Sequence, residues 1–186
     1  MISQLDLTRP SGKSWEVSGK ASCSSSAESS RGGLYCCKKT LDTCDQTGWR
    51  ICNAEFLGAL AQGLAGLGEL DEALVTADKA LTTAGHAGDD YAVSELLRIK
   101  GEVLLQQAGD QSIAAEDCFQ GALEIAQQQD AVFWELRVAL SLARLRIGQN
   151  RQNDAREILA PTYDRFTEGF DTADLKQARS LLQQMG

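Results

Sequence analysis

The stretch LGALAQGLAGLGELDEAL, residues 57–74, contains almost only Ala, Leu and Gly, with a few carboxylates. From Leu57 onward its leucines and alanines recur at i, i+3, i+4 and i+7, which makes one apolar stripe on an α-helix. Gly66 and Gly68 then interrupt this pattern before a second helical one begins. The stretch therefore predicts two apolar helices that touch closely, joined by a turn at Gly68.

Similar interruptions divide the rest of the chain into helices. Gly or polar residues gather at 66–68, 85–90, 109–110, 129–130, 148–150 and 169–171. Between them lie six segments of roughly 14–18 residues, and a last segment begins at Thr172. No segment has the alternating pattern of a strand. The fold class that we expect is all-α, with seven helices.

Small residues recur at equivalent places in these helices. Ala73, Ala115 and Ala155 are 42 and 40 residues apart, and each lies in the second helix of a pair. A stacked array needs such residues where two helices approach closely. The predicted repeat anchors are Ala61, Ala73, Gly101, Ala115, Phe119, Ala143 and Ala155.

These anchors resemble the tetratricopeptide pattern W-x2-L-G-x2-Y…A-x3-F…P. Ala115-x3-Phe119 matches it, whereas leucine replaces the first aromatic residue and the final proline is absent. Pro161 falls inside the sixth helix, where it either kinks that helix or starts a new one. The resemblance implies antiparallel helix pairs stacked as a short right-handed solenoid, with about three pairs and a C-terminal capping helix.

The C-terminal part, residues 133–182, looks like the terminal repeats of large bacterial signalling regulators. Its most specific piece is FTEGFDTADLKQA, residues 166–178, and the likeness extends over roughly residues 39–186. Such regulators join a nucleotide-cyclase-like or winged-helix module to an NTPase module and end in a helical array. The resemblance implies that this chain is the tail of such a regulator and that the NTPase or cyclase portion is a partner. Catalytic activity does not carry over, because those modules are missing.

Composition changes sharply near residue 38. Ten of the first 37 residues are Ser, against four in residues 51–186. We expect residues 1–37 to be irregular or disordered, and residues 38–186 to form the helical repeat domain. A flexible arm and an artefactual start of the reading frame both fit this composition.

Charge and hydropathy limit the partners. Residues 51–186 carry 11 Lys/Arg and 21 Asp/Glu, a net charge of −10, which opposes direct binding to nucleic acid. No apolar run is long enough to cross a membrane, and no signal peptide is evident. We expect a cytoplasmic protein with no nucleic-acid or membrane partner.

No residue set predicts catalysis, a metal or a cofactor. The early cysteines lack a C-x-x-C pair, and free thiols in a reducing compartment are favoured. The only histidine, His86, is expected in a solvated loop, and no phosphate-binding loop is present. We expect Phe133 and Trp134 to fill the groove between repeat units instead of forming a ligand site.

The resemblance to tetratricopeptide arrays implies that the first helix of each pair lines a concave face, which could bind a protein or peptide segment. The charged and polar residues expected there are Glu55, Gln62, Glu95, Arg98, Glu102, Arg137 and Arg144. Exposed arginines are frequent in binding hot spots, although a merely solvated face would have the same composition. The favoured function is a non-catalytic protein-interaction or regulatory scaffold module. The alternative is a repeat domain that senses a small-molecule effector.

Overall fold

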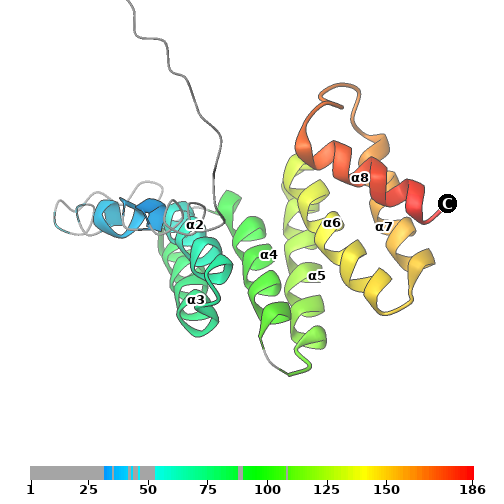
Figure 1. Cartoon of the computed structure of the whole chain (residues 1–186). Helices are drawn as coiled ribbons and strands as arrows, with labels where there is room; N and C mark the ends of the chain where they lie inside the picture. Colours follow the sequence, from blue (N-terminus) through cyan, green and yellow to red (C-terminus); the bar gives the residue numbers. More distant parts are fainter. Residues whose placement is uncertain are drawn as a thin grey trace, which may run out of the picture.

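A computed structural model describes residues 32–34, 36–41, 43, 46, 53–87, 90–107 and 109–186. Those residues contain helices and connecting turns but no strand, which confirms the all-α class. The labelled helices are α2 (Asn53–Gly66), α3 (Leu70–Ala87), α4 (Asp90–Gln106), α5 (Ser112–Gln128), α6 (Val132–Gly148), α7 (Gln152–Asp164) and α8 (Ala173–Gln184). Figure 1 shows them following one another across the molecule, from α2 and α3 on one side to α7 and α8 on the other.

Most interruptions contain one residue with a left-handed backbone. The residues with positive φ are Gly68 (81°), Gly109 (107°), Asp130 (50°), Asn150 (61°) and Gly169 (75°). Only Gly, Asn and Asp adopt this conformation readily, and it ends a helix by turning the chain out of the spiral. The predicted interruption at 85–90 starts too early, because α3 continues through Ala87. The backbone of His86 is therefore helical and not part of a loop.

The helices contact only near neighbours along the chain. Every consecutive pair from α2 to α8 is in contact, and α2–α4, α4–α6 and α6–α8 touch as well. The helices α3, α5 and α7 make no contacts with one another. The even-numbered helices thus form one continuous row, and each odd-numbered helix packs beside that row.

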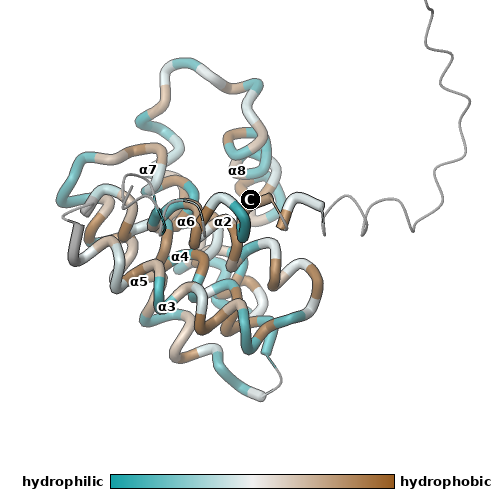
Figure 2. Tube along the Cα trace, turned by 90° about the vertical axis from the view of Figure 1, so that its left-hand side faces the viewer, coloured by the Kyte–Doolittle hydropathy of each residue, from teal (hydrophilic) through white to brown (hydrophobic). Residues whose placement is uncertain are grey.

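Small buried residues allow this close packing. All seven predicted anchors are buried. Six of them have 0% of their surface exposed: Ala61, Ala73, Ala115, Phe119, Ala143 and Ala155; the seventh is Gly101. At Gly58 on α2 a Cβ atom would lie 2.6 Å from Leu96 Cδ2 on α4. Brown and teal alternate along the helices in Figure 2, as expected for helices with one buried face.

The helical part reaches further toward the N-terminus than predicted. Residues 32–34, 36 and 37, on the N-terminal side of the expected boundary at residue 38, are helical. Leu34 and Cys37 pack against the core between α2 and α3, and Lys38 Nζ lies 2.8 Å from Glu72 Oε1. The predicted disorder of residues 1–31 lies outside the described residues.

The sequence left the role of Pro161 open and predicted a buried place for Phe133. Pro161 lies inside α7 and does not start a new helix. Phe133 is 48% exposed, so the expectation that it fills a groove between units is wrong.

No helix in the described part of the chain combines the length and the apolar character needed to cross a membrane.

Candidate functional site

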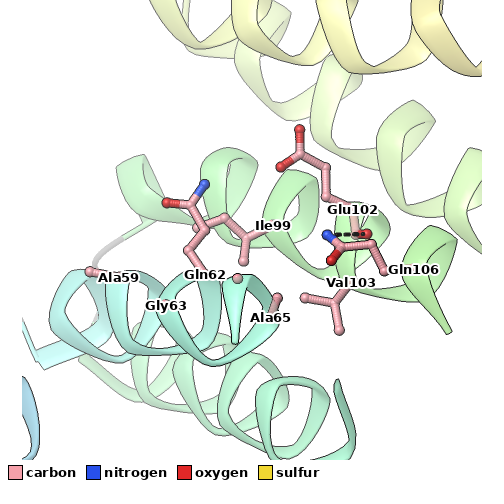
Figure 3. A pocket seen from close by; sticks show the side chains of 9 residues that line it. Ala59, Gln62, Gly63, Ala65, Ile99, Glu102, Val103 and Gln106 are labelled. Atoms are coloured by element: carbon pink, nitrogen blue, oxygen red, sulfur yellow. Dashed lines mark hydrogen bonds between the residues drawn. The ribbon is translucent and has the colours of Figure 1, made fainter. Parts of the chain in front are cut away.

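The candidate site is a groove between α2 and α4. A hollow of about 500 Å³ is lined by residues of these two helices only, and a second hollow of about 190 Å³ adjoins it. Both are lined by Ala59, Gln62 and Ile99, so they form one continuous groove. Figure 3 shows Gln62 from α2 and Glu102 from α4 directed to the same open side of the groove.

The floor of the larger hollow is apolar and its rim is polar. Ala65 and Val103 are buried, and the space where a side chain of Gly66 would lie is open. On the rim, Gln106 Nε2 donates a hydrogen bond to the Glu102 carbonyl oxygen at 3.3 Å. An extended chain could bury side chains against this floor while the rim amides and carboxylate pair with its polar groups.

The smaller hollow brings together residues from three helices. Glu55 and Gly58 come from α2, Tyr91 and Glu95 from α4, and Trp134 from α6. The Tyr91 hydroxyl donates a hydrogen bond to Glu55 Oε1. Tyr91 is 50% exposed, so its ring forms an accessible wall. Two aromatic side chains and two carboxylates distinguish this hollow from its larger neighbour.

An ion-pair network crosses the row of even-numbered helices. Arg98 Nε and Nη2 donate to the two carboxylate oxygens of Glu95, each at 2.7 Å, and Arg98 Nη1 lies 2.5 Å from Glu102 Oε1. Arg137 Nη1 on α6 lies 3.0 Å from the same Glu95. Ser141 Oγ, also on α6, donates to Glu102 Oε1 at 2.9 Å. The network therefore ties α4 to α6.

Arg98 is not the exposed arginine that we expected. Its side chain is only 4% exposed, and both carboxylates that it contacts belong to its own helix. Burial alone would lower the pKa of Arg98, but the hydrogen bonds and charges of Glu95 and Glu102 outweigh burial and raise that pKa above its ordinary value. Arg98 is thus a permanently charged internal group that neutralises the network.

The other predicted face residues take different places. Gln62 is exposed in the groove, and Glu55 and Glu95 line its smaller hollow. Arg137 lies over Trp134, with the guanidinium carbon 5.6 Å from the ring centroid. Arg144 is away from both hollows and donates to Gln177 Oε1 on α8 at 2.6 Å.

Sequence reasoning missed Tyr91, and it expected Trp134 to fill a groove between repeat units instead of lining a ligand site. Tyr91 precedes Glu95 by four positions, and Trp134 precedes Arg137 by three, which places each aromatic residue beside a predicted face residue on its helix. That spacing was the available signal. It does not show that residues from α4 and α6 converge on α2, because convergence depends on helix packing.

The described part of the chain offers little metal or nucleophile chemistry. Within it, no three His, Cys, Asp or Glu side chains are grouped so that they could hold a metal ion. Cys36, Cys37 and Cys118 are free thiols. Burial is the main cause that raises the pKa of Cys118, which favours its unreactive thiol form.

Comparison with known proteins gives no assignment. No protein-family model matches the chain, and no curated protein matches it significantly.

Proposed function

We propose that the chain is a non-catalytic, cytoplasmic interaction module whose groove between α2 and α4 binds a peptide segment of a partner protein. In this proposal the helices form a short tetratricopeptide-like right-handed solenoid of antiparallel pairs. The partner segment belongs to a bacterial signalling or transcriptional regulator, for example to the NTPase or cyclase portion of that regulator. The continuous groove with an apolar floor and a polar rim is the observation that carries the proposal.

The shape of the groove supports a peptide more than a small effector. Pockets for drug-sized ligands are commonly about 300–1,000 Å³ and enclose most of the ligand. The hollow of about 190 Å³ is below this range and fits one side chain, while the adjoining hollow of about 500 Å³ is within the range but lies open along α2 and α4. A linear segment with one deeply inserted side chain matches this shape.

Peptide selection followed by a blocking substitution tests the proposal. The full chain is used to select binders from a displayed library of random peptides, and a selected peptide is then synthesised for isothermal titration calorimetry. Gln62→Trp places a large ring in both hollows, because exposed Gln62 lines each of them. We expect this variant to bind the peptide about tenfold more weakly or worse.

Gln120→Trp is the matched control. Gln120 is also an exposed glutamine inside a helix, but it lies on α5 and lines neither hollow. Its affinity for the peptide should equal that of the unmodified chain. Failure to select any peptide, or equal binding by Gln62→Trp, would contradict the proposed function.

A further inference from the structure

One carboxylate of the groove has no cationic partner in the part of the chain that the structure describes. Glu55 Oε1 accepts the Tyr91 hydroxyl, whereas Glu55 Oε2 is buried and accepts no hydrogen bond. No Lys or Arg among the described residues forms an ion pair with Glu55. Burying a carboxylate oxygen without a donor is unfavourable, so a ligand that brings a donor to this side chain would relieve that cost.

Glu95, the other carboxylate of the smaller hollow, is already neutralised. It receives two hydrogen bonds from Arg98 and a third cationic contact from Arg137. Its charge is therefore used inside the network, and Glu55 alone supplies unbalanced negative charge to the hollow. A cation entering the hollow would meet Glu55 without displacing an existing ion pair.

The walls of the hollow suit a cation on an apolar stem. Tyr91 provides an aromatic ring, which attracts a cation placed over its face, and Trp134, over which Arg137 already lies, provides further aromatic surface. Gly58, Leu96 and Ile99 line the same space and provide an apolar surface for methylene groups. A Lys side chain has such a stem with a charged end, and it commonly buries the stem while the charge finds a polar partner.

The geometry favours Lys over Arg. A guanidinium group binds a carboxylate best through two parallel hydrogen bonds, which need both oxygens. The Tyr91 hydroxyl already donates to Glu55 Oε1, so a guanidinium group would have to share that oxygen with Tyr91, whereas Oε2 has no donor. An ammonium group is a compact point charge that needs a single oxygen.

We propose that the hollow formed by Glu55, Tyr91 and Trp134 receives the Lys side chain of a basic peptide segment lying along the α2–α4 groove. This inference rests on the proposed function and specifies the partner's chemistry. The net charge of −10 over residues 51–186 complements a basic partner and favours its approach. The rest of the segment lies over the larger hollow, beside Gln62 and Glu102.

The test compares peptide selections made with two forms of the chain. The unmodified chain should enrich Lys at one aligned position of the selected peptides, and Glu55→Gln should lose that enrichment. Glu55→Gln keeps the size of the side chain and removes its charge. Glu124→Gln makes the same change on α5, at an exposed residue outside the groove, and should select the same peptides as the unmodified chain.

Titration of one selected peptide tests whether its Lys side chain interacts with Glu55. The peptide is synthesised with Lys and with neutral Nε-acetyl-lysine at the enriched position. For the unmodified chain, acetylation should weaken binding about tenfold or more, whereas for Glu55→Gln the two peptides should bind alike. Equal thermal unfolding midpoints of the two chain forms would show that Glu55→Gln remains folded.

The remaining outcomes separate this inference from the proposed function. Selected peptides that Gln62→Trp blocks but that show no Lys preference would overturn the Lys inference and leave the interaction module standing. Lys enrichment that persists in Glu55→Gln would place the cation elsewhere. Lysine amide binding as tightly as the peptide would identify a small-molecule site and overturn the peptide. Selection of no peptide at all would overturn both proposals.

Discussion

The ring of Phe119 on α5 packs directly on the backbone of Gly101 on α4. A Cβ atom at residue 101 would lie 2.5 Å from Phe119 Cε1 and 2.9 Å from Cδ1, closer than such atoms approach in real proteins. Phe119 is fully buried, so its ring cannot swing out into solvent without losing its core contacts. The absence of a side chain at Gly101 is what allows these two helices to meet there.

Gly101→Ala should therefore destabilise the protein. In the interior of an exposed helix this substitution would stabilise it by about 1 kcal/mol, because Ala has the higher helix propensity. The collision with Phe119 should outweigh this gain and give a net loss of about 1–3 kcal/mol, measured by urea unfolding. Phe119→Leu in the same chain should recover part of the loss, since a smaller side chain leaves room for the Cβ atom.

Gly121→Ala is the control for this prediction. Gly121 also lies in a helix interior, but a Cβ atom there would be 3.8 Å from Leu97 Cδ1, an ordinary contact. This variant should be more stable than the unmodified chain by about 0.5–1 kcal/mol. If both Gly variants unfolded at higher urea concentration, the packing of Phe119 on Gly101 would be wrong.

Ala115→Glu should destabilise the protein by about 3 kcal/mol or more, because it forces bulk and an unpaired charge into a fully buried site. Gln120→Glu on the same helix adds the same charge at an exposed position and should change the free energy of unfolding by less than about 0.5 kcal/mol. Urea unfolding of both variants measures the difference. Similar midpoints would mean that the two faces of α5 are assigned wrongly.

Arg98→Met should destabilise the protein by about 3 kcal/mol, because it leaves the carboxylates of Glu95 and Glu102 without their shared cation. Arg98→Lys should be intermediate, since an ammonium group cannot reproduce the two hydrogen bonds to Glu95. Thermal and urea unfolding both report the effect. An Arg98→Met variant as stable as the unmodified chain would show that the network contributes little.

Lys100→Met tests whether burial of the ion pairs is the reason for the loss of stability expected in Arg98→Met. Lys100 lies on the same helix and forms an ion pair with Asp78 at 2.7 Å, but Asp78 is largely exposed. An exposed pair contributes at most about 1 kcal/mol. Lys100→Met should therefore cost much less stability than Arg98→Met.

Cys118 should react slowly with iodoacetamide. Burial, as the largest cause, raises the pKa of its thiol, and only the thiolate is the nucleophile. At about pH 8 in the folded protein, exposed Cys36 should be alkylated faster than Cys118, and the rate at Cys118 should rise as the pH approaches its raised pKa. Mass spectrometry of the digested chain measures both sites. Equal rates in the folded protein would contradict the burial of Cys118.

The sequence predicts the seven helices from α2 to α8 and most of their ends, because these depend on local chemistry. Gly68, Gly109 and Asn150 belong to the few residue types that tolerate a left-handed backbone, so an interruption can be recognised from the residue itself. The exception is the end of α3, where Gly85 is tolerated inside the helix. A single Gly lowers helix propensity but does not end a helix that is packed against its neighbours.

The candidate site is less accessible to sequence reasoning, because its charges pair across and along helices. The spacing of Glu95, Arg98 and Glu102 at three and four residues already allows ion pairs within one helix, and this signal could have predicted that Arg98 is occupied. The meeting of Tyr91 with Glu55 joins residues 36 positions apart. That contact depends on how α2 packs against α4.

The succession of contacts along the chain also bears on how the molecule folds and opens. No labelled helix touches another that is more than two places away in the series from α2 to α8. Short sequence separations reduce the chain entropy lost in reaching the folded state, which favours rapid folding. An end helix has neighbours on one side only, so α8 can detach while α4 to α6 remain together. Backbone amides of α8 should then exchange with solvent deuterium sooner than those at the centre of the row.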